Sequence, residues 1–76
     1  MNIKVKFFAD LRNRFGKESA CRLPEGSTIA DLFKQVELPE ELTRIVLVNG
    51  KSIEGNMNYG LCDKDTVSIF PPVGGG

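Results

Sequence analysis

Residues 28–36, with the sequence TIADLFKQV, decide the fold class of this 76-residue chain. Thr28 and Asp31 match the capping box, in which a threonine and an acidic residue three positions later cap the first turn of a helix. Apolar residues then recur at helical spacing and form one stripe, namely Ile29, Leu32, Phe33 and Val36. The pattern predicts a helix of about two and a half turns with one packed face. Leu38-Pro39 ends it, because proline disfavours helical geometry in the residue before it.

The residues before this helix predict two strands joined by a short helical segment. Residues 3–7 alternate between apolar side chains and lysines, which is typical of a half-buried strand. Residues 9–15 predict a helical segment that ends at Gly16, because glycine readily takes a left-handed conformation. Residues 19–23 predict a second strand, since the strong turn signal Pro-Glu-Gly follows at 24–26.

The residues after the helix predict three further strands. Residues 45–48 are continuously apolar, and Asn-Gly at 49–50 is a strong hairpin signal, so residues 51–53 are expected to form a brief return strand. Residues 66–70 alternate again, with Val67 and Ile69 on one face. This order of elements predicts an α+β domain in which one main helix covers one face of a sheet.

Composition and charge exclude several classes of function. The formal net charge is zero, which argues against nucleic acid or an anionic membrane as the main partner. No stretch approaches the roughly 20 apolar residues that a membrane helix needs. The two cysteines are too few for a disulfide-built scaffold, and no signal peptide is evident, so a reduced, cytoplasmic protein is expected.

The residue types needed for catalysis are also largely missing. The chain has no histidine, which rules out Ser-His and Cys-His dyads and histidine metal sites. Cys21 and Cys62 lack zinc-type spacing, and the carboxylates show no pairing that indicates acid–base work. We therefore expect no bound metal or cofactor and no autonomous active site.

The character of the chain changes abruptly after the last predicted strand. Residues 1–70 form the predicted domain, and residues 71–76, Pro-Pro-Val-Gly-Gly-Gly, form a predicted flexible, extended tail. Prolines favour an extended geometry of about 3.1 Å per residue, and the glycines remove all side-chain bulk at the tip. Such a tail fits a narrow channel in a partner and presents the carboxylate of Gly76. The alternative is a frayed end or the remnant of an expression vector.

Two stretches resemble the MoaD family, the small subunit of molybdopterin synthase. They are residues 5–12, VKFFADLR, and residues 63–73, DKDTVSIFPPV, which the glycines follow. The resemblance spans essentially the whole chain and implies the ubiquitin-like β-grasp fold, a mixed sheet in which the first and last strands pair in parallel. One departure is Gly74, where MoaD tails commonly have another small residue.

The resemblance also implies a mechanism and partners. An activating enzyme would consume ATP to adenylate Gly76, and a persulfide sulfur donor would convert the adenylate to a thiocarboxylate. The loaded tail would then enter the large subunit of molybdopterin synthase and donate sulfur to a pterin precursor, making the ligand of molybdenum or tungsten. The tail residues that would bind the partner are Gly75, Gly74, Pro72 and Pro71.

Two phenylalanines predict a docking surface beside the tail. On the first strand Phe8 faces away from the apolar side, and on the last strand Phe70 faces away from Val67 and Ile69. If the two strands are neighbours, the rings form one exposed aromatic patch, which normally marks an interface. The alternative places Phe8 in a buried stripe with Leu11 and Phe15.

Other functions remain open at this stage. A ThiS-type carrier would deliver sulfur to another product, such as the thiamin thiazole. A ubiquitin-like modifier would join Gly76 to lysines, and a plain β-grasp interaction module would have an inert tail.

Overall fold

The capping box predicted at residues 28–31 begins the main helix of the computed structural model, which describes residues 1–72. The helix, α2, spans Ile29–Gln35. Thr28 Oγ1 accepts a hydrogen bond from the backbone N–H of Asp31 at 3.3 Å, and Asp31 Oδ2 accepts one from the backbone N–H of Thr28 at 2.8 Å. Both partners of the box therefore satisfy N–H groups that the first turn of a helix leaves free.

The C-terminus of α2 is closed by a Schellman motif. The N–H of Leu38 donates to Phe33 O at 2.9 Å, and the N–H of Glu37 donates to Lys34 O at 3.2 Å. This arrangement requires a left-handed residue, and Glu37 takes that conformation with φ 57°. The helix thus stops before Leu38-Pro39, as predicted. Leu38 and Phe33 are both buried, which gives the apolar contact that usually accompanies the motif.

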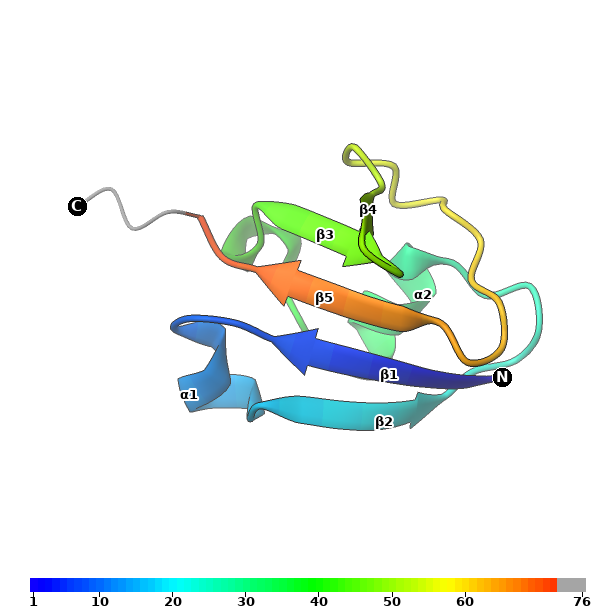
Figure 1. The fold of residues 1–76 in the computed structure, drawn as a ribbon, viewed down its shortest axis with the longest axis horizontal. Coiled ribbons are helices and arrows are strands. Elements are labelled where there is room, and N and C mark those ends of the chain that lie inside the picture. Colours follow the sequence, from blue (N-terminus) through cyan, green and yellow to red (C-terminus); the bar gives the residue numbers. More distant parts are fainter. Residues whose placement is uncertain (73–76) are drawn as a thin grey trace.

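Within residues 1–72, five strands form one mixed sheet in the order β2-β1-β5-β3-β4 (Figure 1). The first and last strands in sequence, β1 and β5, pair in parallel at the centre, and the other pairs are antiparallel. This is the β-grasp arrangement that the resemblance implied. The strands are β1 (Asn2–Phe7), β2 (Glu18–Arg22), β3 (Ile45–Val48), β4 (Lys51–Ser52) and β5 (Thr66–Phe70).

The element boundaries differ slightly from the predicted ones. The strand β2 starts one residue earlier than expected, because the N–H of Phe7 bonds to Lys17 O at 3.0 Å and extends the pairing with β1. The short helix α1 spans Leu11–Phe15, within the predicted segment. The 3₁₀ helix η1 (Glu40–Leu42), between α2 and β3, was not predicted from the sequence. The return strand β4 ends at Ser52, one residue before the predicted end.

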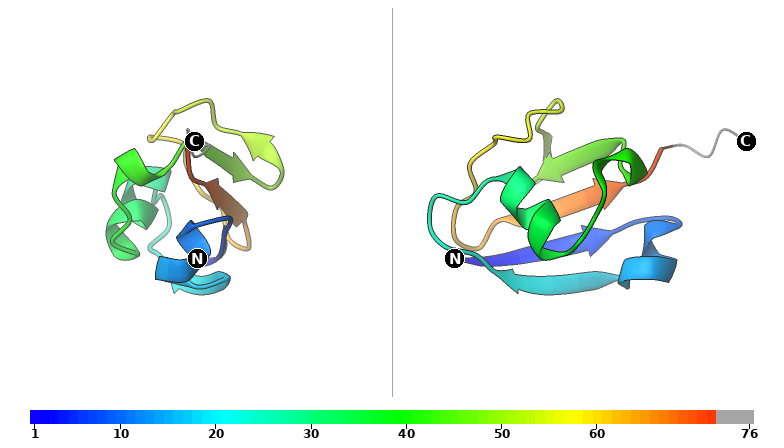
Figure 2. Two further views of the ribbon diagram at one scale, coloured as in Figure 1. Left: turned by 90° about the vertical axis from the view of Figure 1, so that its left-hand side faces the viewer. Right: turned by 180° about the vertical axis from the view of Figure 1, so that it is seen from behind.

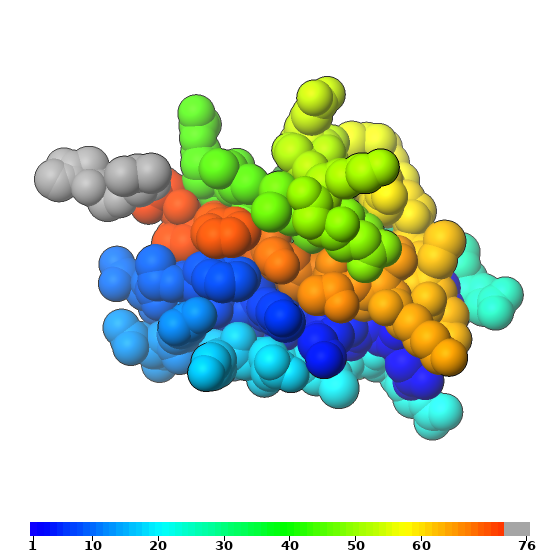
Figure 3. All heavy atoms as spheres, viewed as in Figure 1, coloured from blue at the N-terminus to red at the C-terminus, as the bar shows by residue number. Residues whose placement is uncertain are grey.

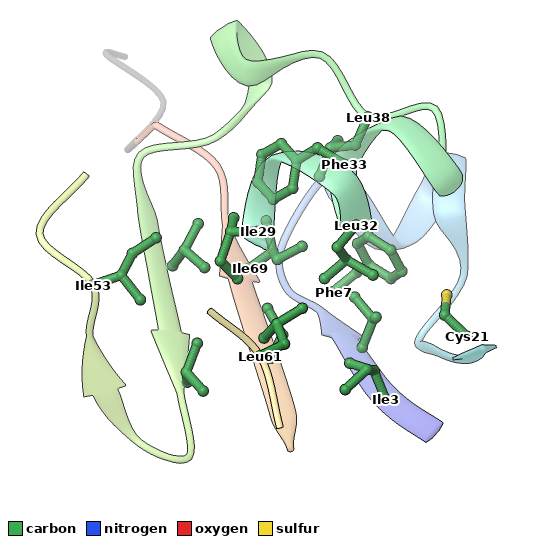
Figure 4. Packing of buried hydrophobic residues seen from close by; sticks show 14 of the residues in the cluster. Ile3, Phe7, Cys21, Ile29, Leu32, Phe33, Leu38, Ile53, Leu61 and Ile69 are labelled. Atoms are coloured by element: carbon green, nitrogen blue, oxygen red, sulfur yellow. The ribbon is translucent and has the colours of Figure 1, made fainter. Parts of the chain in front are cut away.

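The core lies between α2 and one face of the sheet (Figure 2). In Figure 4 the α2 side chains Ile29, Leu32 and Phe33 point toward Ile69 and Phe7 of the central strands. Val36, the last residue of the predicted stripe, is half-buried at the helix cap. The largest fully buried side chains come from α2 and the two central strands: Phe7, Ile3, Ile29, Leu32, Ile69, Val5 and Val67.

The Asn49-Gly50 turn joins β3 to β4 and also holds the start of β5. Both residues have positive φ, 52° and 85°, as the tight hairpin turn requires. The side chain of Asn49 accepts a hydrogen bond from the N–H of Thr66 at 2.9 Å and donates one to Asp65 Oδ1 at 2.8 Å. Asp65 Oδ2 accepts a further bond from the N–H of Cys62 at 2.8 Å. This network connects the hairpin to the loop that leads into β5.

Candidate functional site

The parallel pairing of β1 and β5 brings their C-terminal ends to the same edge of the molecule. Phe7 lies opposite Ile69 in the register, and the N–H of Phe8 donates to Ile69 O at 3.1 Å. Phe8 therefore lies beside Phe70 at the end of the sheet. The chain leaves this edge through Pro71, away from the body of the domain (Figure 1).

The rings of Phe8 and Phe70 stack on the outer face of the sheet, opposite α2. Their centroids are 4.3 Å apart and their planes differ by 10°. The predicted contact between them is confirmed, although each ring is half-buried because each covers the other. The alternative that placed Phe8 with Leu11 and Phe15 is wrong, since Phe7 takes that place. Phe7 stacks on Phe15 at 5.2 Å between centroids.

Arg12 of α1 lies over the Phe8 ring of the stacked pair. Its guanidinium carbon lies 5.3 Å from the centre of the Phe8 ring, and its Nε donates to Phe7 O at 2.9 Å. A cation over an aromatic face is attracted by the ring's quadrupole. Ala9, which links Phe8 to α1, turns the chain by taking a left-handed conformation with φ 53°. That turn positions α1 beside Phe8.

The strand β3 extends the aromatic pair into a longer apolar surface. Ile45 lies opposite Phe70 in the register and is 46% exposed, and Leu47 is half-exposed on the same face. Arg44, just before β3, donates its N–H to Phe70 O at 2.8 Å. We call Phe8, Phe70, Ile45 and Leu47 the apolar sheet surface. It lies on the side of the sheet that faces the viewer in Figure 3.

The outward positions of Ile45 and Leu47 were not predicted from the sequence. Residues 45–48 were interpreted as one apolar run, although alternate residues of a strand must face opposite sides of the sheet. In the structure Val46 and Val48 are buried under α2. Ile45 and Leu47 therefore face outward. The signal for this was the apolar character of all four residues, because packing on one face of a strand requires only every second residue to be apolar.

The predicted tail residues fall partly outside the described chain. Pro71 is half-buried against the domain and Pro72 is exposed. Gly74, Gly75 and Gly76 lie beyond residue 72, outside the described residues.

Ionisable groups show no catalytic arrangement in the described part of the chain. Within residues 1–72 no group of three or more His, Cys, Asp or Glu could hold a metal ion. The pKa of Asp63 lies below its usual value, mainly because its carboxylate accepts a hydrogen bond from the N–H of Asn2 at 2.7 Å. Both cysteines are free, Cys21 buried and Cys62 exposed. None of the described helices has the length and apolar character needed to cross a membrane.

The fold and this edge of the sheet define a ubiquitin-like protein, in which the last strand runs from the centre of a β-grasp sheet into a C-terminal segment. The model of the ThiS family matches residues 5–76, and the chain belongs to this family of ubiquitin-like sulfur carriers and modifiers.

The similar proteins include molybdopterin-converting factor subunits and an archaeal modifier protein. The small archaeal modifier protein 3 of Haloferax volcanii is 30% identical, and the alignment covers all of both chains. A putative molybdopterin converting factor subunit 1 from Pyrococcus furiosus is 30% identical, with a TM-score of 0.78. The alignment covers 96% of this chain and 99% of the Pyrococcus furiosus chain. One chain of a complex between subunits 1 and 2 of molybdopterin-converting factor from Helicobacter pylori is 25% identical to this protein. The TM-score is 0.71, and the alignment covers the full length of both chains.

Proposed function

We propose that the chain is a sulfur carrier for molybdopterin synthesis and that the carboxylate of Gly76 is its reactive group. The observation that carries the proposal is the extent of the family match, which runs from residue 5 to residue 76 and therefore includes the glycine end. The path of β5 supports it, because this central strand leads directly into Pro71 at an open edge of the sheet (Figure 1).

The chemistry begins with a group that is unreactive on its own. A free α-carboxyl has a pKa of about 3.5, so at neutral pH Gly76 is an anion and a poor electrophile. In the proposed reaction its oxygen attacks the α-phosphate of ATP and pyrophosphate leaves, giving an acyl adenylate. The terminal sulfur of a persulfide then displaces AMP and forms an acyl disulfide. A thiol cleaves the sulfur–sulfur bond and leaves the thiocarboxylate.

In this proposal the chain supplies the reactive atom and its partners supply the catalytic residues. The adenylating enzyme would bind the ATP, and the large subunit of molybdopterin synthase would bind the loaded tail. The complex of subunits 1 and 2 of molybdopterin-converting factor from Helicobacter pylori supports the proposal that the large subunit is a partner. The fold of one chain in that complex matches this protein over its full length.

The apolar sheet surface is the proposed docking site for these partners. Phe8 and Phe70 are large, pre-stacked side chains beside the segment that enters the partner, and Ile45 adds an exposed aliphatic side chain. Aromatic anchors of this kind contribute most of the binding energy at many interfaces. Arg12 and Arg44 lie at the border, where they would favour an acidic partner surface.

A second candidate function is protein modification. The 30% identical relative from Haloferax volcanii favours it, because that protein is a small archaeal modifier protein. Both functions begin with the same acyl adenylate, and they differ in whether sulfur or a lysine amine displaces AMP.

Intact-mass measurement separates the two. The protein is incubated with a matching adenylating enzyme, ATP and a persulfide donor, and a reaction without the donor is the control. We expect one oxygen of Gly76 to be replaced by sulfur only when the donor is present. Lysine-linked adducts without any thiocarboxylate would instead establish the modifier function.

The recipient of the sulfur is tested with the loaded protein. Thiocarboxylated chain is mixed with a molybdopterin synthase large subunit and a pterin precursor, and in parallel with a thiazole synthase and its substrates. We expect the dithiolene product from the first mixture. Sulfur transfer only in the second mixture would assign the chain to thiamin synthesis.

A further inference from the structure

The strand β2 lies at one edge of the sheet, and one side of its backbone pairs with no other strand of residues 1–72. In Figure 1 it forms the lower edge of the described molecule, and α1 does not extend below it. Two hydrogen bonds, from Phe7 N–H to Lys17 O and from Leu23 N–H to Met1 O, show which residues along β2 direct their backbone N–H and C=O groups toward β1. These are the odd-numbered residues 17–23, so the N–H and C=O groups of Glu18, Ala20 and Arg22 point outward from the edge.

The side chains of these three residues share one face and are exposed. Ser19 is half-buried and Cys21 is buried toward the core, whereas the other three lie on the outer face of the sheet. Along that face the order is acidic, small, basic. A second copy of the strand in antiparallel orientation presents the same three residues in reverse. The edge is therefore complementary to itself about Ala20.

We propose that β2 is a homodimer interface in which two copies pair antiparallel across a two-fold axis at Ala20. Ala20 would lie opposite Ala20 of the other copy, and Glu18 opposite Arg22, in both directions. Three directly opposed pairs with outward backbone groups form roughly six inter-strand hydrogen bonds, because each such pair exchanges two. The small side chain of Ala20 allows the close approach at the axis.

The charges at Glu18 and Arg22 favour pairing with a second copy of β2 over the alternative that they only protect the edge from pairing. Charged side chains do block edge pairing, and like charges at 18 and 22 would have repelled a symmetric partner. The opposite signs found here attract one instead. Lys6 of β1 lies opposite Glu18 in the register, so in the dimer each Glu18 would have a cationic residue on both sides. The other edge strand, β4, has only two residues and no such symmetry.

The proposed dimer leaves the apolar sheet surface accessible. Phe8 and Phe70 lie at one end of the sheet, two and three strands away from the other copy's backbone. The two-fold axis would make the two β5 strands run antiparallel within a ten-strand sheet, so that their C-terminal ends would point in opposite directions. Each copy would thus present its own docking surface independently.

Sedimentation equilibrium over a wide concentration range tests the proposal. The wild-type mass should rise from 8.4 kDa toward twice that value as concentration increases. Glu18→Arg and Arg22→Glu each place like charges opposite one another twice, and each should weaken dimerisation about tenfold or more. The matched control, Lys51→Glu on the exposed β4 edge, should leave dimerisation unchanged.

The decisive measurement mixes the two variants. In a heterodimer of Glu18→Arg and Arg22→Glu every opposed pair is again of opposite sign, so the equimolar mixture should regain wild-type association. Amide hydrogen exchange of the wild type should also show protection of Ala20 that increases with protein concentration. A wild type that stays monomeric throughout, or a dimer that the charge reversals do not weaken, would overturn the proposal.

Discussion

The stacked pair of Phe8 and Phe70 makes a quantitative prediction about stability. We expect Phe8→Ala and Phe70→Ala each to destabilise the fold, and the double variant to lose less than the sum of the two. The reason is that the contact between the rings, at 4.3 Å between centroids, is lost with the first substitution and cannot be lost again.

The magnitude follows from burial and stacking. Replacing a fully buried phenylalanine by alanine costs about 3–5 kcal/mol, and these rings are half-buried, so each single variant should lose roughly half, about 1.5–2.5 kcal/mol. A stacked aromatic pair contributes about 0.5–1.5 kcal/mol beyond the area it buries. The coupling energy of the double-mutant cycle should therefore be about 1 kcal/mol.

Urea unfolding of the four proteins measures this coupling. The control cycle pairs Phe70→Ala with Phe15→Ala, because Phe15 stacks on Phe7 and not on Phe70. That control should be additive within about 0.3–0.5 kcal/mol. A Phe8–Phe70 coupling no larger than the control would refute the reasoning that the two rings support each other.

The remaining predictions concern the helix end, a surface carboxylate and the tail. Glu37→Gly should stabilise the protein by about 0.5–1 kcal/mol in urea unfolding, because Glu37 occupies a left-handed position where glycine has no steric cost; Glu40→Gly, where no such φ occurs, should not stabilise. The lowered pKa of Asp63 means that its ionised form stabilises the fold; this contribution should be present above pH 3.8 and lost as the pH falls below it, and Asp63→Asn should remove that part of the pH dependence. Deleting Gly76 should leave the melting temperature unchanged and cost about a hundredfold or more in sulfur transfer, because the reactive carbon withdraws by roughly 3.5 Å. Normal transfer by the shortened chain would show that Gly75 can act as the terminus.

Local signals in the sequence determined most of the elements. The capping box at Thr28 and Asp31, the alternation along β1 and the Asn49-Gly50 turn each depend on residues a few positions apart, and each was found where it was predicted. The resemblance added the parallel pairing of β1 with β5, which alternation alone does not determine. The chemistry proposed for Gly76 likewise rests on the sequence, through the glycine end and the resemblance to the MoaD family.

The tertiary structure decided which side chains meet. Phe7 and Phe8 are adjacent in sequence and equally apolar, yet one stacks on Phe15 and the other on Phe70, because the strand alternates and only one face packs under α2. The outward position of Ile45 depends on its register with β5, a contact across 25 residues that no local pattern encodes. The free edge of β2 is also a property of the strand order. Such facts depend on pairing between distant segments, and only the assembled sheet determines them.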